Sequence, residues 1–163
     1  MAESLIFNRE SSRDERYRAL TPQVQSLFAG ETDFIANAAN LSALIREAFG
    51  FHWVGFYIVK GDELVLGPFQ GPIACTRIAK GRGVCGTAWA RAETVLVPNV
   101  EEFPGHIACS ALSKSELVIP VKHPLHGVIA VLDIDSAQLD DFNEADVSHL
   151  SEWVRLLEEA SHG

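Results

Sequence analysis

Three cysteines, Cys75, Cys85 and Cys109, are the side chains of this 163-residue chain best suited to covalent chemistry. A thiolate that attacks an electrophilic sulfur or oxygen becomes a sulfenic acid, and a second thiol brought close by the fold condenses with it to a disulfide. Their separations, ten and 24 residues, match neither a zinc-binding nor a CxxC redox spacing. The alternative is three buried, small apolar side chains, so the surrounding sequence has to decide.

Each cysteine lies in or beside an irregular segment, where reactive groups on a rigid scaffold tend to be found. Cys109 lies in a stretch without periodicity, residues 98–114, and a loop of that length in a compact domain is usually functional or disordered. Cys85 stands where a short helix is expected to begin, close to Lys80 and Arg82. Helix N-termini and cations both stabilise thiolates, so we expect the environment of Cys85 to favour its ionised form.

Three carboxylates form the second group of side chains that could take part in catalysis or binding. Asp133 and Asp135 end a predicted strand and, being two residues apart, share one face of it, whereas Glu116 opens the preceding strand. If these strands are neighbours, the three carboxylates meet, and their repulsion raises their pKa values unless a proton or a cation is shared. A ligand ammonium or a metal ion would remove that cost, although ordinary solvated strand ends remain the alternative.

Two aromatic side chains, Trp53 and Tyr57, lie four residues apart on another predicted strand and therefore on one face of it. They could wall a pocket for a small apolar group such as an S-methyl. Ordinary core packing is the alternative interpretation of the same pattern.

The elements that must position these groups follow from hydrophobic periodicity. Spacing typical of helices and runs rich in β-branched and aromatic residues predict the following elements: helices over 12–28, 32–49, 84–91 and 143–159, and strands over 52–60, 63–69, 94–97, 115–121 and 127–134. This order predicts an α+β fold, in which a mostly antiparallel sheet carries the N-terminal helices and the C-terminal helix.

Length and composition narrow the class of protein. A chain of this length suits a single domain, and its composition, 47% hydrophobic and 21% charged, is ordinary for a globular protein. The formal net charge of −9 disfavours nucleic acid and anionic membrane surfaces as partners. We find neither an apolar run approaching the ~20 residues of a membrane span nor the pattern of a signal peptide, so we expect a cytoplasmic location.

The segments around these residues resemble the free methionine-R-sulfoxide reductases, which are single GAF domains. The resemblance covers about residues 12–160, so that 1–163 is expected to form one GAF domain with the sheet and helices described above. It rests on these segments: FHWVGFY at 51–57, GPFQG at 67–71 leading to Cys75, GRGVCGT at 81–87, FPGHIAC at 103–109, SELVIP at 115–120 and GVIAVLDID at 127–135.

The resemblance implies thiol-dependent reduction of free L-methionine-R-sulfoxide to L-methionine, with a disulfide that thioredoxin reduces and with no cofactor or metal. Cys109 would be the nucleophile that becomes a sulfenic acid, Cys75 the chief resolving thiol, and Cys85 a third thiol that assists or is dispensable. One position departs from the family pattern, because Ser110 follows Cys109 where an acidic residue is common. A homodimer is also expected from the family.

The resemblance further implies how the substrate would be held. Glu116, Asp133 and Asp135 would bind its ammonium and help to protonate the sulfoxide oxygen, and Trp53 and Tyr57 would wall the methyl group. A positioned acid of this kind typically contributes ~10²–10⁴-fold to a rate.

Two other classes of function stay open at this point. The first is a GAF-type sensor that binds a small molecule and does no chemistry, since a fold does not by itself determine function. The second is a metal protein with Cys109, His106 and the carboxylates as ligands, although their spacing does not suit a structural zinc site.

Overall fold

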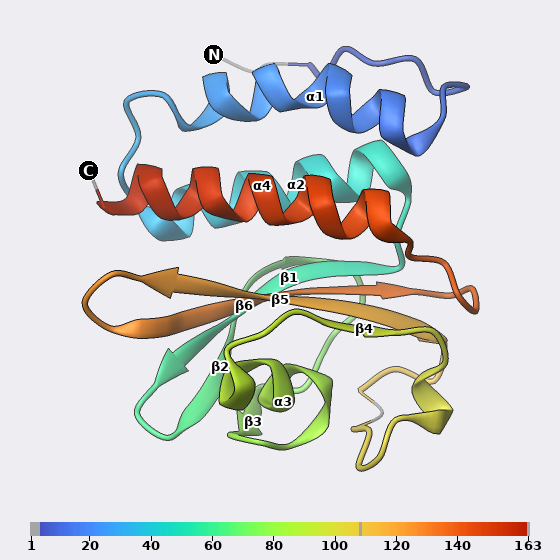
Figure 1. Ribbon diagram of the computed structural model, residues 1–163, viewed down its shortest axis with the longest axis vertical. Helices are drawn as coiled ribbons and strands as arrows, with labels where there is room; N and C mark the ends of the chain where they lie inside the picture. Colours follow the sequence, from blue (N-terminus) through green and yellow to red (C-terminus); the bar gives the residue numbers. More distant parts are fainter. Residues whose placement is uncertain (1–3, 108, 163) are drawn as a thin grey trace.

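The computed structural model describes residues 4–107 and 109–162, and its centre is one antiparallel sheet in the order β3-β2-β1-β6-β5-β4 (Figure 1). The strands are β1 (Trp53–Lys60), β2 (Glu63–Gln70), β3 (Arg77–Ala79), β4 (Val95–Val97), β5 (Ser115–His123) and β6 (Gly127–Ser136). Every pair of neighbouring strands is antiparallel, and the long strands β1, β6 and β5 occupy the middle of the sheet.

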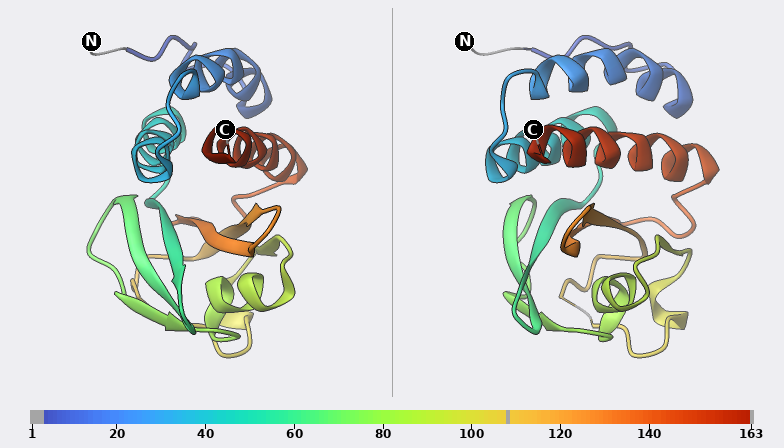
Figure 2. Two further views of the ribbon diagram at one scale, coloured as in Figure 1. Left: turned by 90° about the vertical axis from the view of Figure 1, so that its left-hand side faces the viewer. Right: turned by 60° about the vertical axis from the view of Figure 1, so that its left-hand side comes forward.

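Three helices cover one face of the sheet: α1 (Arg13–Phe28), α2 (Phe34–Phe49) and α4 (Glu144–His162). Figures 1 and 2 show α2 and α4 lying directly on the strands, with α1 packed over them as an outer layer. The predicted α+β architecture with both N-terminal helices and the C-terminal helix on one sheet is confirmed. Among the described residues, no helix combines the length and the hydropathy that a bilayer crossing requires.

Local signals explain where these helices begin and end. The Ser12 side chain accepts a hydrogen bond from the Glu15 amide at the start of α1. α2 begins two residues later than predicted because Asp33 is the residue whose side chain caps it. It ends at Gly50, whose φ of 69° lies in the left-handed region that glycine adopts without strain.

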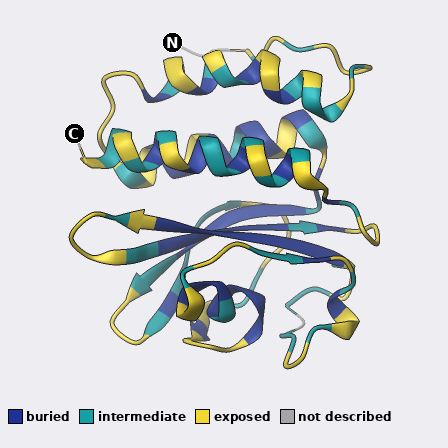
Figure 3. Ribbon diagram, viewed as in Figure 1, coloured by how far each residue is buried: buried dark blue, intermediate teal, exposed yellow. Residues whose placement is uncertain are grey.

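Alternation along the strands divides the interior into two clusters on opposite faces of the sheet. In β6, Leu132 and Ile134 belong to the cluster beneath the helices, whereas Asp133 and Asp135 point to the other face. Figure 3 shows the long strands buried in the middle of the molecule and the helices alternating between buried and exposed residues. The face away from the long helices is therefore the one that carries the polar groups singled out above.

That second face is covered by shorter elements. They are β3, the helix α3 (Gly83–Arg91), and the loop from 98 to 114, which contains the 3-10 helix η1 (Val100–Glu102) (Figure 1). The aromatic residues Trp53 and Tyr57 of β1 belong to this second cluster, together with Val84 and Cys85 of α3. The loops and the short helix thus enclose a space against the middle of the sheet.

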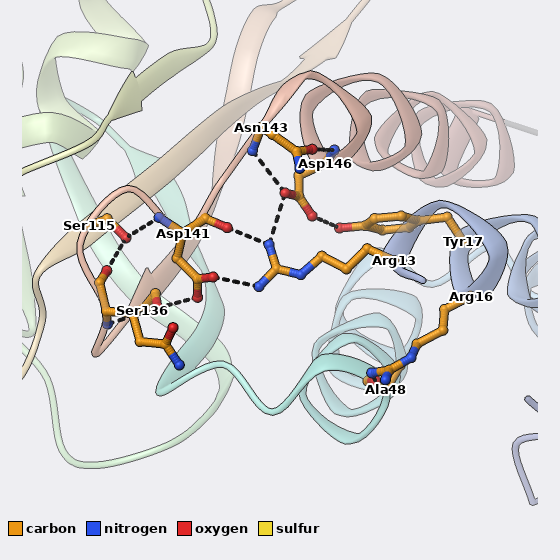
Figure 4. A network of polar contacts seen from close by, with 10 residues as sticks. Arg13, Arg16, Tyr17, Ala48, Ser115, Ser136, Asp141, Asn143 and Asp146 are labelled. Carbon is orange, nitrogen blue, oxygen red and sulfur yellow. Dashed lines mark hydrogen bonds and ion pairs between the residues drawn. The ribbon is translucent and has the colours of Figure 1, made fainter. Parts of the chain in front are cut away.

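A polar network ties α1 to the segment between β6 and α4 (Figure 4). The Arg13 guanidinium pairs with Asp141 at 2.6 Å and with Asp146 at 3.0 Å, and the Tyr17 hydroxyl donates to Asp146 at 2.6 Å. Asn143 caps α4, because its side-chain oxygen accepts hydrogen bonds from the amides of Ala145 and Asp146. The carboxylate of Asp146 is buried, so these partners replace the water that it lost.

We predict that Tyr17→Phe lowers the free energy of unfolding by about 1–3 kcal/mol, because one buried oxygen of Asp146 loses its partner. In a chain of this size each kcal/mol lowers the midpoint of thermal unfolding by about 2–4 °C. Arg155→Met is the matched control, since its pair with Glu159 is exposed at both ends and should leave that midpoint unchanged. Equal shifts in the two variants would show that the buried network contributes no more than a surface pair.

Candidate active site

A small cavity lies between the sheet and the segments that cover its second face. Its volume is about 40 Å³, and its walls come from β1, β5, β6, α3 and the loop before β5. Eight residues were predicted to serve the site, and seven of them line this cavity: Trp53, Tyr57, Cys85, Cys109, Glu116, Asp133 and Asp135. The eighth, Cys75, reaches the site through its bond to Cys109.

Strand register brings the three carboxylates together. Glu116 of β5 pairs with Asp135 of β6, and Asp135 pairs on its other side with Trp53 of β1. Asp133 lies two residues before Asp135 in β6, so its side chain points to the same face of the sheet. Glu116 and Asp133 are only 6% and 5% exposed. Their side chains consequently meet in a space with little water to screen their repulsion.

Burial and mutual repulsion both favour the protonated forms of these carboxyl groups. Burial, then the nearby Asp133 and Asp135, raise the pKa of Glu116 well above its ordinary value. The pKa of Asp135 is raised well above its ordinary value by burial and by Asp133, and burial raises the pKa of Asp133. Among the described residues, Asp133 Oδ1 is buried without a hydrogen-bond partner. These shifts favour protonated carboxyl groups in the cluster, and Asp133 Oδ1 offers an unpaired acceptor to a bound cation.

Cys85 is buried in the same cluster, and the expectation that its environment favours the thiolate is wrong. Its Sγ lies 4.0 Å from Glu116 Oε1 and is only 4% exposed. Burial and the negative charges of Asp133 and Glu116 raise its pKa well above the ordinary value. These effects outweigh the helix N-terminus, and Lys80 lies over the Trp89 ring instead of the thiol.

The other two cysteines are joined in a disulfide, Cys75–Cys109, with their Cα atoms 5.5 Å apart. This is the pairing that the family resemblance implies, and it leaves Cys85 as the free thiol. The bond connects the segment between β2 and β3 to the loop that precedes β5, and residues of both segments line the cavity.

The two aromatic residues of β1 have a role that their spacing did not predict. The Trp53 indole donates a hydrogen bond to the Pro72 carbonyl at 3.0 Å, and the Tyr57 hydroxyl donates to the Cys75 carbonyl at 2.9 Å. Both therefore hold the segment that presents Cys75. Gly71 permits this packing, because its φ is 142° and a Cβ there would lie 2.7 Å from the Trp53 ring.

Two histidines contact the site in ways that sequence reasoning missed or left open. His52 Nε2 lies 3.1 Å from the Ser110 hydroxyl, which connects the start of β1 to the residue after Cys109. No sequence signal could have found this contact across 58 positions. His106 Nε2 lies 3.8 Å from Glu116 Oε2, and burial lowers the pKa of His106, so this pair is weak as an ion pair.

The chain matches the family model for the GAF domain over residues 38–160. GAF domain-containing protein A of Dictyostelium discoideum is 54% identical over 159 residues, which are 97% of this chain and 99% of that protein. Free methionine-R-sulfoxide reductase of Escherichia coli K12 is 48% identical over 150 residues, which are 90% and 89% of the two chains. These relatives match nearly their whole length.

A solved structure gives the same result in three dimensions. The free methionine-R-sulfoxide reductase of Neisseria meningitidis, in complex with its substrate, superimposes with a TM-score of 0.93 at 50% sequence identity. The match covers 98% of this chain and 95% of that one. The likeness thus extends over the covering loops as well as the sheet.

Proposed function

The chain belongs to the GAF-domain free methionine-R-sulfoxide reductases, and we propose that it reduces free L-methionine-R-sulfoxide to L-methionine with Cys109 as the attacking thiol. The observation that carries this proposal is that Cys109 and three clustered carboxyl groups line one cavity. A sulfur nucleophile and a proton donor are the two groups that reduction of a sulfoxide requires.

In the first step the Cys109 thiolate attacks the sulfoxide sulfur while a carboxyl group gives a proton to the sulfoxide oxygen. The hydroxyl then passes to the Cys109 sulfur as its bond to the substrate sulfur and the new bond between the two sulfurs break, which releases methionine and leaves a sulfenic acid. Glu116 is the proton donor that we assign, because burial and the neighbouring aspartates raise its pKa and so favour its protonated form.

In the second step the Cys75 thiol attacks the Cys109 sulfenic acid, and the hydroxyl leaves as water. The two thiols supply the two electrons of the reduction and end as the disulfide that the structure contains. Cys85 takes no part in this exchange in our proposal, because it is buried among carboxylates that disfavour its thiolate.

We assign binding of the substrate to the groups around this reacting sulfur. The unpartnered Oδ1 of Asp133, with Asp135 beside it, is suited to accept hydrogen bonds from the substrate ammonium. Trp53 and Tyr57, whose ring centroids are 5.9 Å apart, offer an apolar wall for the methyl group. The R epimer would be selected because, with the ammonium and the methyl group both anchored, only one of the two epimers directs its sulfoxide oxygen towards Glu116.

Thioredoxin is the reductant that we propose for the Cys75–Cys109 disulfide, acting in the cytoplasm. A disulfide that joins two surface connections can be approached by the dithiol of another protein, which would reduce it by exchange. A reducing compartment would keep this disulfide transient, which agrees with a catalytic role.

We further propose that the protein is a homodimer that pairs through its N-terminal helices. A groove between α1, α2 and the preceding segment is lined by Leu5, Ile6, Leu27 and Leu44. Ile6 in this groove is a large apolar residue that is 78% exposed. Light scattering should give twice the monomer mass of 17.8 kDa, and Ile6→Glu should reduce it towards the monomer value.

The reaction is tested by mixing the protein with thioredoxin, thioredoxin reductase, NADPH and free methionine-R-sulfoxide. We expect NADPH consumption and stoichiometric methionine with the R epimer, and little with the S epimer. No turnover of the R epimer by fully reduced protein would overturn the proposal. Ligand binding that survives replacement of all three cysteines, without any turnover, would favour a sensor instead.

The size of the cavity gives a prediction about the oxidised form. About 40 Å³ is far below the ~300–1,000 Å³ typical of ligand sites, so the loops held by the disulfide exclude an amino acid. We expect free L-methionine to bind the oxidised protein at least about tenfold more weakly than the reduced protein, which is ~1.4 kcal/mol or more. Calorimetry on the two forms measures this, and equal affinities would show that the disulfide leaves the site open.

A further inference from the structure

We infer that the Cys85 thiol and the carboxylates of Glu116 and Asp133 form a binding site for a thiophilic divalent cation, Zn²⁺ being the natural occupant. The reaction proposed above gives Cys85 no task, although it lies in the middle of the polar cluster. The sulfur of Cys85 and one oxygen from each carboxylate lie within 4.8 Å of one another.

The spacing of these three atoms suits a tetrahedral ion. Zinc bonds of ~2.0–2.3 Å place neighbouring ligand atoms about 3.5 Å apart. Cys85 Sγ is already 4.0 Å from Glu116 Oε1, so the three side chains need to approach by only about 1 Å, which lies within reach of rotamer adjustment. They come from α3, β5 and β6, so the ion would be held from three sides.

A second observation points to a ligand at this place. Asp133 is 5% exposed, and its Oδ1 is buried against the cavity without a hydrogen-bond partner among the described residues. A buried acceptor left without a partner costs free energy, which a cation would recover. The adjoining 40 Å³ is also enough for a water molecule, which would complete a four-coordinate site with three protein ligands.

The chemistry of the ligands selects the metal. A thiolate is a soft ligand that favours zinc, whereas magnesium and calcium prefer six or more oxygen ligands. Binding replaces the thiol proton of Cys85, and any proton held by the Glu116 and Asp133 carboxyl groups, by the metal and releases these protons to solvent, without any change of oxidation state. The acidic character of the chain, with a formal net charge of −9, favours arrival of a cation.

One consequence rests on the proposed function. The metal would occupy the carboxylate oxygens that we assign to the substrate ammonium and to proton transfer, so Zn²⁺ and substrate would exclude each other. Zinc would therefore be a reversible inhibitor that competes with free methionine-R-sulfoxide for the reduced protein.

The test uses the full chain with Cys75→Ser and Cys109→Ser, in which Cys85 is the remaining thiol. Titration with Co²⁺ should produce one equivalent of the near-ultraviolet absorption of a thiolate–cobalt bond, and Zn²⁺ should displace it. The matched control adds Cys85→Ser. Replacing a group that only orients a metal ligand costs ~10–100-fold in affinity, so losing the sulfur should weaken zinc binding at least about 100-fold.

A second variant keeps the thiol and removes a carboxylate. Asp133→Asn in the same background should weaken zinc binding at least about tenfold, and free L-methionine should raise the apparent dissociation constant for zinc in the parent protein. Absence of the thiolate absorption, or its persistence after Cys85→Ser, would overturn the metal site. If the wild-type protein reduces the sulfoxide but the titration fails, the metal site is refuted and the proposed reaction stands. If zinc binds through Cys85 but the wild-type protein shows no turnover, the proposed reaction is refuted and the metal site stands.

Discussion

Cys109→Ser should abolish reduction of free methionine-R-sulfoxide, to below about 10⁻³ of the wild-type kcat/KM, whereas the variant should still bind methionine. A serine hydroxyl keeps the size of the side chain but cannot supply a thiolate, and no sulfenic acid can form. The readout is methionine formed per chain in the thioredoxin-coupled assay, with calorimetry of methionine binding in parallel. The loss should lie in kcat, because no binding group has been removed.

Cys85→Ser is the matched control for this variant. The thiol of Cys85 is free and buried, so its replacement should leave much of the turnover in place. An equal loss in both variants would contradict our assignment of Cys109 as the attacking thiol and Cys85 as a bystander. Cys75→Ser should fall between them, with one fast turnover and then a slow cycle, because the sulfenic acid forms but lacks its resolving partner.

The second large effect is expected at Glu116. Glu116→Gln keeps the shape of the side chain and removes the acidic proton, so kcat/KM should fall by about 10²–10⁴-fold, the usual contribution of a positioned acid. Asp133→Asn should instead act chiefly on KM, because Asp133 is assigned to the ammonium. Steady-state kinetics of the two variants separates these roles, and a pure KM effect at Glu116 would contradict its role as proton donor.

The pH dependence follows from the direction of the Glu116 shift. Burial and the neighbouring aspartates raise its pKa, so the acid form that we propose as proton donor persists to a higher pH than for an ordinary glutamate. Wild-type activity should fall as pH rises through this raised pKa, and Glu116→Gln should lack that alkaline limb. Stability follows the same sign: a pKa that is higher in the folded chain gives a contribution that is present at low pH and lost as pH rises through the folded value.

Sequence patterns predicted most of the fold because the signals are local. Helical spacing placed the long helices to within a few residues, and alternation in β6 placed Asp133 and Asp135 on one face. The meeting of these residues with Glu116 required only that β5 and β6 be neighbours, which a short connection favours.

What the sequence could not predict depends on contacts between distant segments. The raised pKa of Cys85 comes from burial and from carboxylates that begin 31 positions away, and these effects overturn the local influence of a helix N-terminus. The hold that Trp53 and Tyr57 exert on the Cys75 segment, and the contact between His52 and Ser110, likewise have no periodic signature. Ser110, which stands where an acidic residue is common in the family, makes one of these contacts, because its hydroxyl lies beside His52.

A single-turnover experiment shows which cysteines reduce the sulfoxide. Fully reduced protein is mixed with one equivalent of free methionine-R-sulfoxide, the remaining thiols are alkylated, and the peptides are mapped by mass spectrometry while methionine is counted. We expect one methionine per chain, a disulfide between Cys75 and Cys109, and an alkylated Cys85. Our assignment would be contradicted if methionine formed while Cys109 remained a free thiol that the reagent alkylates. A disulfide that contains Cys85 in place of Cys75 would contradict it as well.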